Sequence, residues 1–223
     1  MARPRIRDYF QQDLDQNQNI TPKQRAILQA SLDLFAEKGF DQTSTSDIAQ
    51  RAGVAEGTVY RRYKTKAALR DAVLAPIAAK IVPILASDFS EDELHRRYPS
   101  LQAFLTAVVN DRMQFVQNNL KELKVIFEMA AFDATRRERI LSQIAPQMVQ
   151  QVGSVLDQLK ADKLMVDWPN DLIIQTLLSQ VFGYIARLMM GFPGTSFDRE
   201  RTYLIAVLTK VLTPGENDQL EID

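Results

Sequence analysis

The chain has 223 residues, with 27 Lys+Arg against 28 Asp+Glu and a formal net charge of -1. Hydrophobic residues make up 46% of it and charged residues 25%, which are ordinary values for a globular protein. It contains no cysteine and a single histidine, His95, so disulfides, thiolate metal sites and cysteine nucleophiles are excluded. We therefore expect no enzyme, no metal site and no other cofactor.

The sequence shows neither an export signal nor a membrane segment. Met1 to Phe10 is basic, but no apolar stretch follows it, as a signal peptide would require. The longest apolar run without a charge, Leu172 to Ala186, is shorter than the roughly 20 residues that cross a bilayer. We expect a soluble, cytoplasmic protein.

Residues 1–20 are polar and show no helical periodicity, so we expect a mobile N-terminal arm. Its three arginines, Arg3, Arg5 and Arg7, fit two interpretations. They could reach into a DNA minor groove, or they could form an ordinary charged tail.

Helical signals begin at Thr21. Thr21 and Gln24 have the spacing of a capping box, Pro22 falls at the first helical position, and Gly39 supplies a stop. These signals predict a first helix of about 17 residues.

Two short helices and a long one are expected next. Ser44 begins a helix of about eight residues that ends before Gly53. A third helix runs from about Ala55 to Tyr63, and Thr65 can cap a fourth that continues to about Pro83.

The rest of the chain reads as helix, and no strand pattern stands out. The expected helices run from 100 to the Asn118–Asn119 pair, from 121 through 127, from 146 to 164, from 172 to 190 and from 199 to 212. The acidic tail, 215–223, is expected to be frayed.

Residues 45–63 carry the clearest functional signal. Small Ala49 permits a close helix crossing, and Gly53 permits the positive φ of a tight turn. Two short helices joined in this way form a helix-turn-helix unit whose second helix enters the DNA major groove. A plain helical hairpin is the alternative, but it needs neither the two small residues nor an Arg- and Tyr-rich second helix.

This part of the chain resembles the tetracycline-repressor (TetR) family of bacterial transcriptional regulators. The resemblance rests on the following stretches: Arg25–Phe40, Thr43–Ser44, Asp47–Ala49, Arg51–Val54, Gly57–Tyr60, Tyr63, Thr65–Lys66 and Leu69. It implies an all-α protein with an N-terminal three-helix helix-turn-helix domain, 21–67, with its motif at about 44–63. A C-terminal helical effector-binding and dimerisation domain, 68–214, is expected to follow.

The resemblance also implies roles at the DNA. Hydroxyls at the start of the second helix would hold a phosphate, Gly57 would allow a close approach, and Lys66 would grip the backbone. The residues expected to contact DNA are Thr43, Ser44, Thr45, Ala55, Glu56, Gly57, Thr58, Tyr60, Arg61, Arg62 and Lys66.

Two of these positions depart from the family pattern. Ala55 stands where Ser or Thr is usual, so the recognition helix lacks a side-chain cap, at a cost of about 1 kcal/mol. Glu56 stands where Lys is common, and a carboxylate there repels phosphates but can accept from cytosine N4. We expect Glu56 to tune specificity.

The family further implies an effector pocket and a homodimer. The pocket candidates are Phe104, Arg112, Phe115, Phe127, Met148, Phe182 and Tyr184. The interface candidates are Leu177, Val181, Ile185, Leu204, Val207, Leu208 and Val211. Either set could instead be plain core, and Arg112 could be a surface arginine with a buried stem.

Charge is divided unevenly along the chain. Residues 1–70 hold 12 Lys+Arg and 8 Asp+Glu, net +4, whereas residues 71–223 are net -5. The near-zero total thus averages a basic end that reads DNA with an acidic body. The resemblance implies a repressor that a small-molecule effector releases from its operator. A regulator without an effector, and a helical carrier or enzyme, remain as alternatives.

Overall fold

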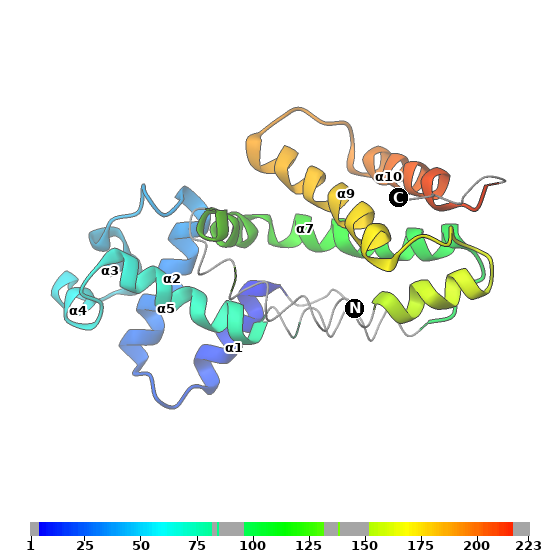
Figure 1. Cartoon of the computed structure of the whole chain (residues 1–223). Helices are drawn as coiled ribbons and strands as arrows, with labels where there is room; N and C mark the ends of the chain where they lie inside the picture. The colour runs from blue at the N-terminus through cyan, green and yellow to red at the C-terminus, as the bar shows by residue number, and fades with distance from the viewer. Residues whose placement is uncertain (1–4, 82–83, 85–95, 132–137, 139–151, 216–223) are drawn as a thin grey trace. The chain divides into compact units, whose positions relative to one another are not determined.

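The computed structural model describes residues 5–81, 84, 96–131, 138 and 152–215, and their regular secondary structure is entirely helical, as predicted (Figure 1). The chain divides into two compact units. The first comprises 1–84 and 118–143, and the second comprises 85–117 and 144–223.

The first unit contains the N-terminal helices in chain order. They are α1 (Ile6–Gln16), α2 (Pro22–Lys38), α3 (Thr45–Ala52), α4 (Glu56–Arg62), α5 (Lys66–Pro76) and the π-helical turn η1 (Ile77–Ile81), followed by the C-terminal part of α7 (Leu101–Ala131). The predicted extents of α2 and α3, 17 and 8 residues, are confirmed.

Local capping signals explain why these helices begin and end where they do. Thr21 caps α2 in a capping box with Gln24, and Ser44 caps α3 in the same way with Asp47. Gly53 ends α3 in the left-handed conformation at φ 65°, which residues with a Cβ rarely adopt.

Helices α2, α3, α4 and α5 share one apolar core. Ile27 of α2, Ile48 of α3, Val59 of α4 and Leu69 of α5 are all fully buried. The packing pairs are α2 with α3, α3 with α4, and α2 with α5. This core fixes the orientation of the short helix α4.

Two ion pairs join α2 to α3 at the surface. Lys38 Nζ lies 2.7 Å from Asp47 Oδ2, and Arg51 contacts Glu37 with both terminal nitrogens, the closer at 3.0 Å. The hydrogen bond from Lys38, followed by those from Ser44, holds the pKa of Asp47 well below its usual range. The bond from Arg51 likewise lowers the pKa of Glu37.

The expectation of a mobile arm is wrong over Ile6–Gln16, because α1 is a packed helix. Ile6, Phe10 and Leu14 follow one another at helical spacing and are buried. Three apolar residues in a polar segment are a weak periodic signal, and the helix depends on contacts with η1 and α2.

Polar contacts fix α1 in place as well. Arg7 pairs with Asp33 of α2 at 2.6 Å, and Asp13 pairs with Lys80 of η1 at 2.6 Å. The backbone N–H of Ile6 donates to Oδ1 of buried Asn119 at 2.7 Å. Of the three arginines considered for a minor-groove arm, Arg7 is therefore held by α2, Arg5 is the N-cap of α1, and Arg3 lies outside the described residues.

The predicted fourth helix is interrupted. It begins after Thr65, as expected, but Pro76 lies inside it and the chain continues as the π-helical turn η1. Proline lacks an N–H and clashes with the preceding turn, which explains the change of helix type. Ile77 and Ile81 nevertheless remain buried.

The second unit contains the first part of α7, a helix over 152–161, α9 (Asn170–Met190) and α10 (Phe197–Leu212). The break predicted at Asn118–Asn119 is present as a kink in α7, where Asn119 has the non-helical angles φ -124° and ψ 16°. The division between the two units falls at this kink.

Helix α9 is, by length and composition alone, apolar enough to cross a membrane. Few of its residues are buried within the chain. Phe182 at 58% and Met190 at 68% are among its exposed apolar side chains.

Candidate nucleic-acid interface

Helices α3 and α4 form a helix-turn-helix. The N–H of Val54 donates to the carbonyl of Ala49 at 3.0 Å, which closes the turn after Gly53. Val59 of α4 is fully buried, whereas its neighbours Tyr60, Arg61 and Arg62 are exposed. The sequence of α4 thus gives one face to the core and presents a hydrogen-bonding and basic face to solvent.

Three polar side chains meet where α3 and α4 begin. Thr45 Oγ1 lies 3.1 Å from Glu56 Oε1 and 2.9 Å from the Tyr60 hydroxyl. A carboxylate only accepts, so Thr45 donates its one proton to Glu56 and Tyr60 donates to Thr45. This chain of bonds fixes the direction of the Glu56 carboxylate, and it brings together three of the predicted DNA-contact residues.

The start of α4 has no side-chain cap, as the presence of Ala55 predicted. Glu56 lies in the first turn, where a negative charge is favourable near the N–H groups of a helix. Neither packing nor backbone requires glycine at position 57, because a Cβ there would meet nothing within 4 Å and φ is not positive. The first unit by itself would therefore accept a larger residue at position 57.

Three other residues of α4 lie beside the start of α2. Thr58, Arg61 and Arg62 line a groove of about 630 Å³ together with the start of α2, from Thr21 to Gln24 and Ile27. From the sequence, Thr21 and Gln24 are expected to cap a helix, and Lys23 has no expected role. The signal that could have found them is tertiary, because they lie more than 30 residues from α4 in the sequence.

Thr43 corrects one prediction. Its side chain is 1% exposed, and its hydroxyl contacts the carbonyls of Gly39 at 2.8 Å and Leu34 at 3.3 Å. The hydroxyl therefore serves the turn between α2 and α3 and is not exposed for contact with a phosphate. The expected contact through backbone N–H groups at the start of α3 stays a prediction. Ser44 is exposed, but its side chain is also used within the unit, because it caps α3.

Lys66 also differs from its expected role. Its ammonium donates to the carbonyls of Phe40, Asp41 and Thr43 at 2.9, 3.2 and 3.1 Å. These bonds use all three protons of the ammonium, which also lies 4.4 Å from the centre of the Phe40 ring. Lys66 thus joins α5 to the loop after α2, rather than presenting free donors to a phosphate.

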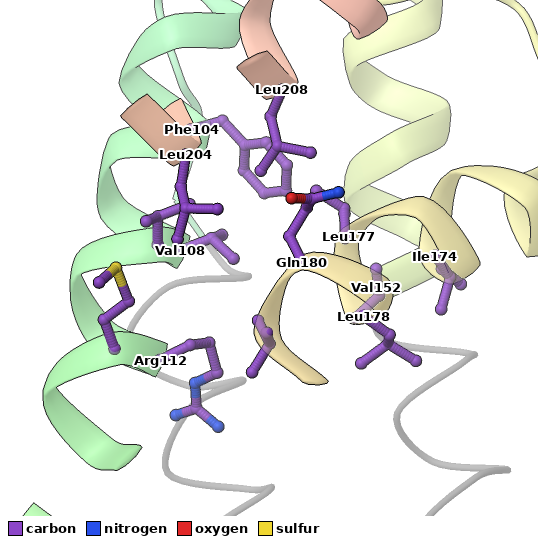
Figure 2. A pocket seen from close by; sticks show the side chains of 13 residues that line it. Phe104, Val108, Arg112, Val152, Ile174, Leu177, Leu178, Gln180, Leu204 and Leu208 are labelled. Carbon is purple, nitrogen blue, oxygen red and sulfur yellow. The ribbon is translucent and has the colours of Figure 1, made fainter. Parts of the chain in front are cut away.

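The second unit contains an apolar cavity of about 100 Å³ (Figure 2). Phe104 and Arg112, both predicted for a pocket, line it. So do four residues predicted for a dimer interface: Leu177, Val181, Leu204 and Leu208. The cavity is therefore formed by α7, α9 and α10, with Val152 from the helix over 152–161.

Four of the other five pocket candidates do not line this cavity. Phe115 lies beside Arg112, whose guanidinium carbon is 5.2 Å from the ring centre. Tyr184 is buried, and its hydroxyl accepts from Gln117 at 3.3 Å. Phe127 and Phe182 are 52% and 58% exposed, and Met148 lies outside the described residues.

Two polar side chains reach the cavity. Arg112 donates to the neighbouring Asp111 carboxylate, with Nε at 2.7 Å, so the pair adds no net charge. Gln180 has no hydrogen-bond partner for its amide among the residues that the structure describes. Figure 2 shows this amide among the apolar side chains near Phe104 and Leu177, with the Arg112 guanidinium turned away from them.

The last helix presents an apolar stripe to solvent. Tyr203, Val207 and Val211 follow at four-residue spacing and are 55%, 49% and 41% exposed. Ile185 of α9 is partly exposed. Exposed apolar side chains at helical spacing are the usual mark of a surface that another helix covers.

The core shared by α2, α3, α4 and α5, the turn at Gly53 and the basic outer face of α4 define a helix-turn-helix DNA-binding regulator. Residues 27–73 match the family described as "Bacterial regulatory proteins, tetR family". The match covers the helix-turn-helix segment of the first unit.

Relatives support the same assignment over longer stretches. The Bacillus subtilis "Uncharacterized HTH-type transcriptional regulator YvkB" is 24% identical over 81% of this chain and 90% of its own length. The Mycobacterium tuberculosis "HTH-type transcriptional repressor Rv3405c" is 45% identical over 32% of this chain and 38% of its own. These relatives are transcriptional regulators and not enzymes.

Solved structures show the same fold. The crystal structure of a putative transcriptional regulator from Saccharomonospora viridis in complex with choline superposes with a TM-score of 0.66 at 17% identity. The match covers 86% of this chain and 98% of that one, so it includes the C-terminal helices. The family match over residues 27–73 and the similarity to curated regulators describe a DNA-binding transcriptional regulator of the TetR type, and the solved structure adds the likeness in fold.

Proposed function

We propose that the protein is a homodimeric repressor that leaves its operator when a small lipophilic molecule binds in the cavity of the second unit. The observation that carries this proposal is the apolar cavity lined by Gln180, whose amide has no hydrogen-bond partner among the described residues. Binding sites for small molecules are typically apolar and contain a few polar groups that orient the ligand.

The lining favours an uncharged ligand. Arg112 is already paired with Asp111, and it is the one charged side chain among the described residues that line the cavity. A charged ligand would lose its hydration without gaining an opposite charge. The cavity of about 100 Å³ is somewhat smaller than one known to bind benzene, about 150 Å³. It therefore takes a small ligand group, or its lining side chains move to admit a larger one.

The ligand must favour one arrangement of the protein to affect DNA binding. Helix α7 is a candidate for this coupling, because Phe104 and Arg112 line the cavity whereas the residues after its kink at Asn119 belong to the DNA-binding unit. The choline-bound regulator from Saccharomonospora viridis supports a ligand in proteins of this fold, and the name of Rv3405c supports a repressor.

Dimerisation is proposed through α9 and α10. The stripe of Tyr203, Val207 and Val211 would be covered by a second copy, and two copies would place two recognition helices on two half-sites. The aspartate substitution Val207→Asp, on an exposed position, should leave the subunit folded while producing a monomer in sedimentation experiments. A dimer that persists in Val207→Asp and Val211→Asp would remove this interface.

A mobility-shift assay with the DNA upstream of the gene tests the function directly. A shifted band that small uncharged aromatic molecules abolish would support the repressor. A shift that no ligand in a broad panel affects would favour a regulator without an effector, and absence of a specific shift would contradict operator binding.

A further inference from the structure

We propose that the groove between the start of α2 and the end of α4 binds a phosphate of the operator backbone. It is lined by Thr21, Pro22, Lys23, Gln24 and Ile27 of α2 and its cap, and by Thr58, Arg61 and Arg62 of α4. The proposal rests on DNA binding alone and does not depend on an effector.

The charge of the groove is one-sided. Lys23, Arg61 and Arg62 contribute three positive charges, and no acidic residue is among the described residues that line the groove. In the first turn of α2, Pro22 has no N–H and the N–H of Gln24 donates to the Thr21 hydroxyl, so the N–H of Lys23 is the one left without an acceptor in the helix. The groove therefore has the electrostatics of an anion site.

The side chain of Gln24 points independently to a ligand. Its Oε1 accepts from the N–H of Thr21 at 2.8 Å, and this bond fixes which end of the amide is oxygen. Its Nε2 is then a donor, and it is buried with no hydrogen-bond partner in a residue only 8% exposed. A buried donor without an acceptor is unfavourable, and an anionic oxygen in the groove would satisfy it.

The position of the groove identifies the anion as a DNA phosphate. Arg61 and Arg62 belong to the helix that enters the major groove, and they lie at its C-terminal end. A duplex that receives α4 must pass its backbone beside that end, where the start of α2 lines the same groove as these arginines. Such a contact would position the protein on DNA without reading its sequence.

Lys23→Gln and Gln24→Glu test the proposal. Lys23 is exposed, so its loss should not affect folding. Glutamate at position 24 can still accept from Thr21, because Glu serves in a capping box, but it replaces the donor with an acceptor. Lys121→Gln and Gln18→Glu, at exposed positions outside the groove, provide the same changes of charge as controls.

Binding of each variant is measured by fluorescence anisotropy over a salt series, on an upstream duplex and on an unrelated duplex. Lys23→Gln should weaken both by a similar factor, about tenfold, and should reduce the slope of log K against log salt by about 0.9. Gln24→Glu should weaken both more than Gln18→Glu does. Thermal melting of each variant confirms that it is folded.

Two results would overturn the proposal. One is that the groove variants and their controls have the same affinities and salt slopes. The other is that inorganic phosphate raises the melting temperature of the wild type but not of Lys23→Gln, while DNA binding is unchanged, because the groove would then bind a free anion.

Discussion

The hydroxyl of Thr45, the first residue of α3, lies 3.1 Å from the carboxylate of Glu56, the first residue of α4. The two helices of the motif are thus joined by a polar contact on the face that we expect to meet DNA. Because Tyr60 completes the chain of bonds, Glu56 is held as a directed acceptor rather than as a mobile charge.

Glu56→Ala should change which operators the protein prefers. A fixed carboxylate can accept from cytosine N4 and disfavours other bases, by about 1–3 kcal/mol for a good contact. Relative affinities for a panel of single-base operator variants should therefore become more even at one or two positions. The matched change Glu122→Ala, in the same unit but outside the motif, should preserve the ranking. An unchanged ranking in Glu56→Ala would show that the carboxylate has no part in specificity.

Gly57→Ala should separate folding from DNA binding. Alanine is the better helix former, and its Cβ would meet nothing within 4 Å, so the free energy of unfolding should rise by about 0.5 kcal/mol. The same methyl group would project from the recognition helix, so operator affinity should fall. Urea unfolding and anisotropy titrations measure the two effects. A variant that binds as tightly as the wild type would mean that the duplex does not approach position 57 closely.

Phe10→Ala should destabilise the protein although it lies in the first 20 residues. The side chain is fully buried, and removal of a buried phenylalanine usually costs about 3–5 kcal/mol. Phe192→Ala, at a position that is 56% exposed, is the control and should have little effect. Equal unfolding curves for the two variants would restore the interpretation of this segment as a mobile arm.

The signals that predicted the DNA-binding unit are local in sequence. Thr21 with Gln24, Ser44 with Asp47, and Gly53 each act within one turn of their own helix, so their spacing alone locates the helices. The fold and the position of the recognition helix could be predicted for this reason.

What could not be predicted depends on partners far along the chain. Phe10 is buried only because α1 packs on η1 and α2, and Thr43 and Lys66 are committed to carbonyls of the loop after α2. The same limit applies in the second unit, where Leu204 and Leu208 line a cavity although their helical stripe suggested an interface.

Acid should weaken the link between α2 and α3. The pKa of Asp47 is held well below its usual range by Lys38 and Ser44, so the unfolded chain binds the proton more readily. Its contribution to stability is present above the ordinary carboxylate pKa, near pH 4, and is lost as the pH falls below that value. Asp47→Asn should therefore be less stable than the wild type at pH 7, and the difference should shrink at pH 3. A difference that stays constant between these two pH values would contradict the assignment.

Gln180→Leu should alter the choice of ligand while the fold is retained. Benzyl alcohol, toluene, benzoate and benzylammonium share one ring and differ in their polar group. If the Gln180 amide orients a neutral ligand, the wild type should prefer benzyl alcohol to toluene in calorimetric titrations, and Gln180→Leu should reverse that order by removing the hydrogen bond. Both charged compounds should bind more weakly than benzyl alcohol. The same order of affinities in both proteins would exclude a role for this amide.

The most direct measurement of DNA recognition by α4 compares two duplexes by anisotropy at about 150 mM salt. One carries the DNA upstream of the gene, and the other has the same base composition in scrambled order. We predict that the upstream duplex binds at least about 1,000-fold more tightly, and that a Gly57→Ala subunit loses most of this preference. Equal affinities for the two duplexes would contradict the assignment of α4 as a sequence-reading helix.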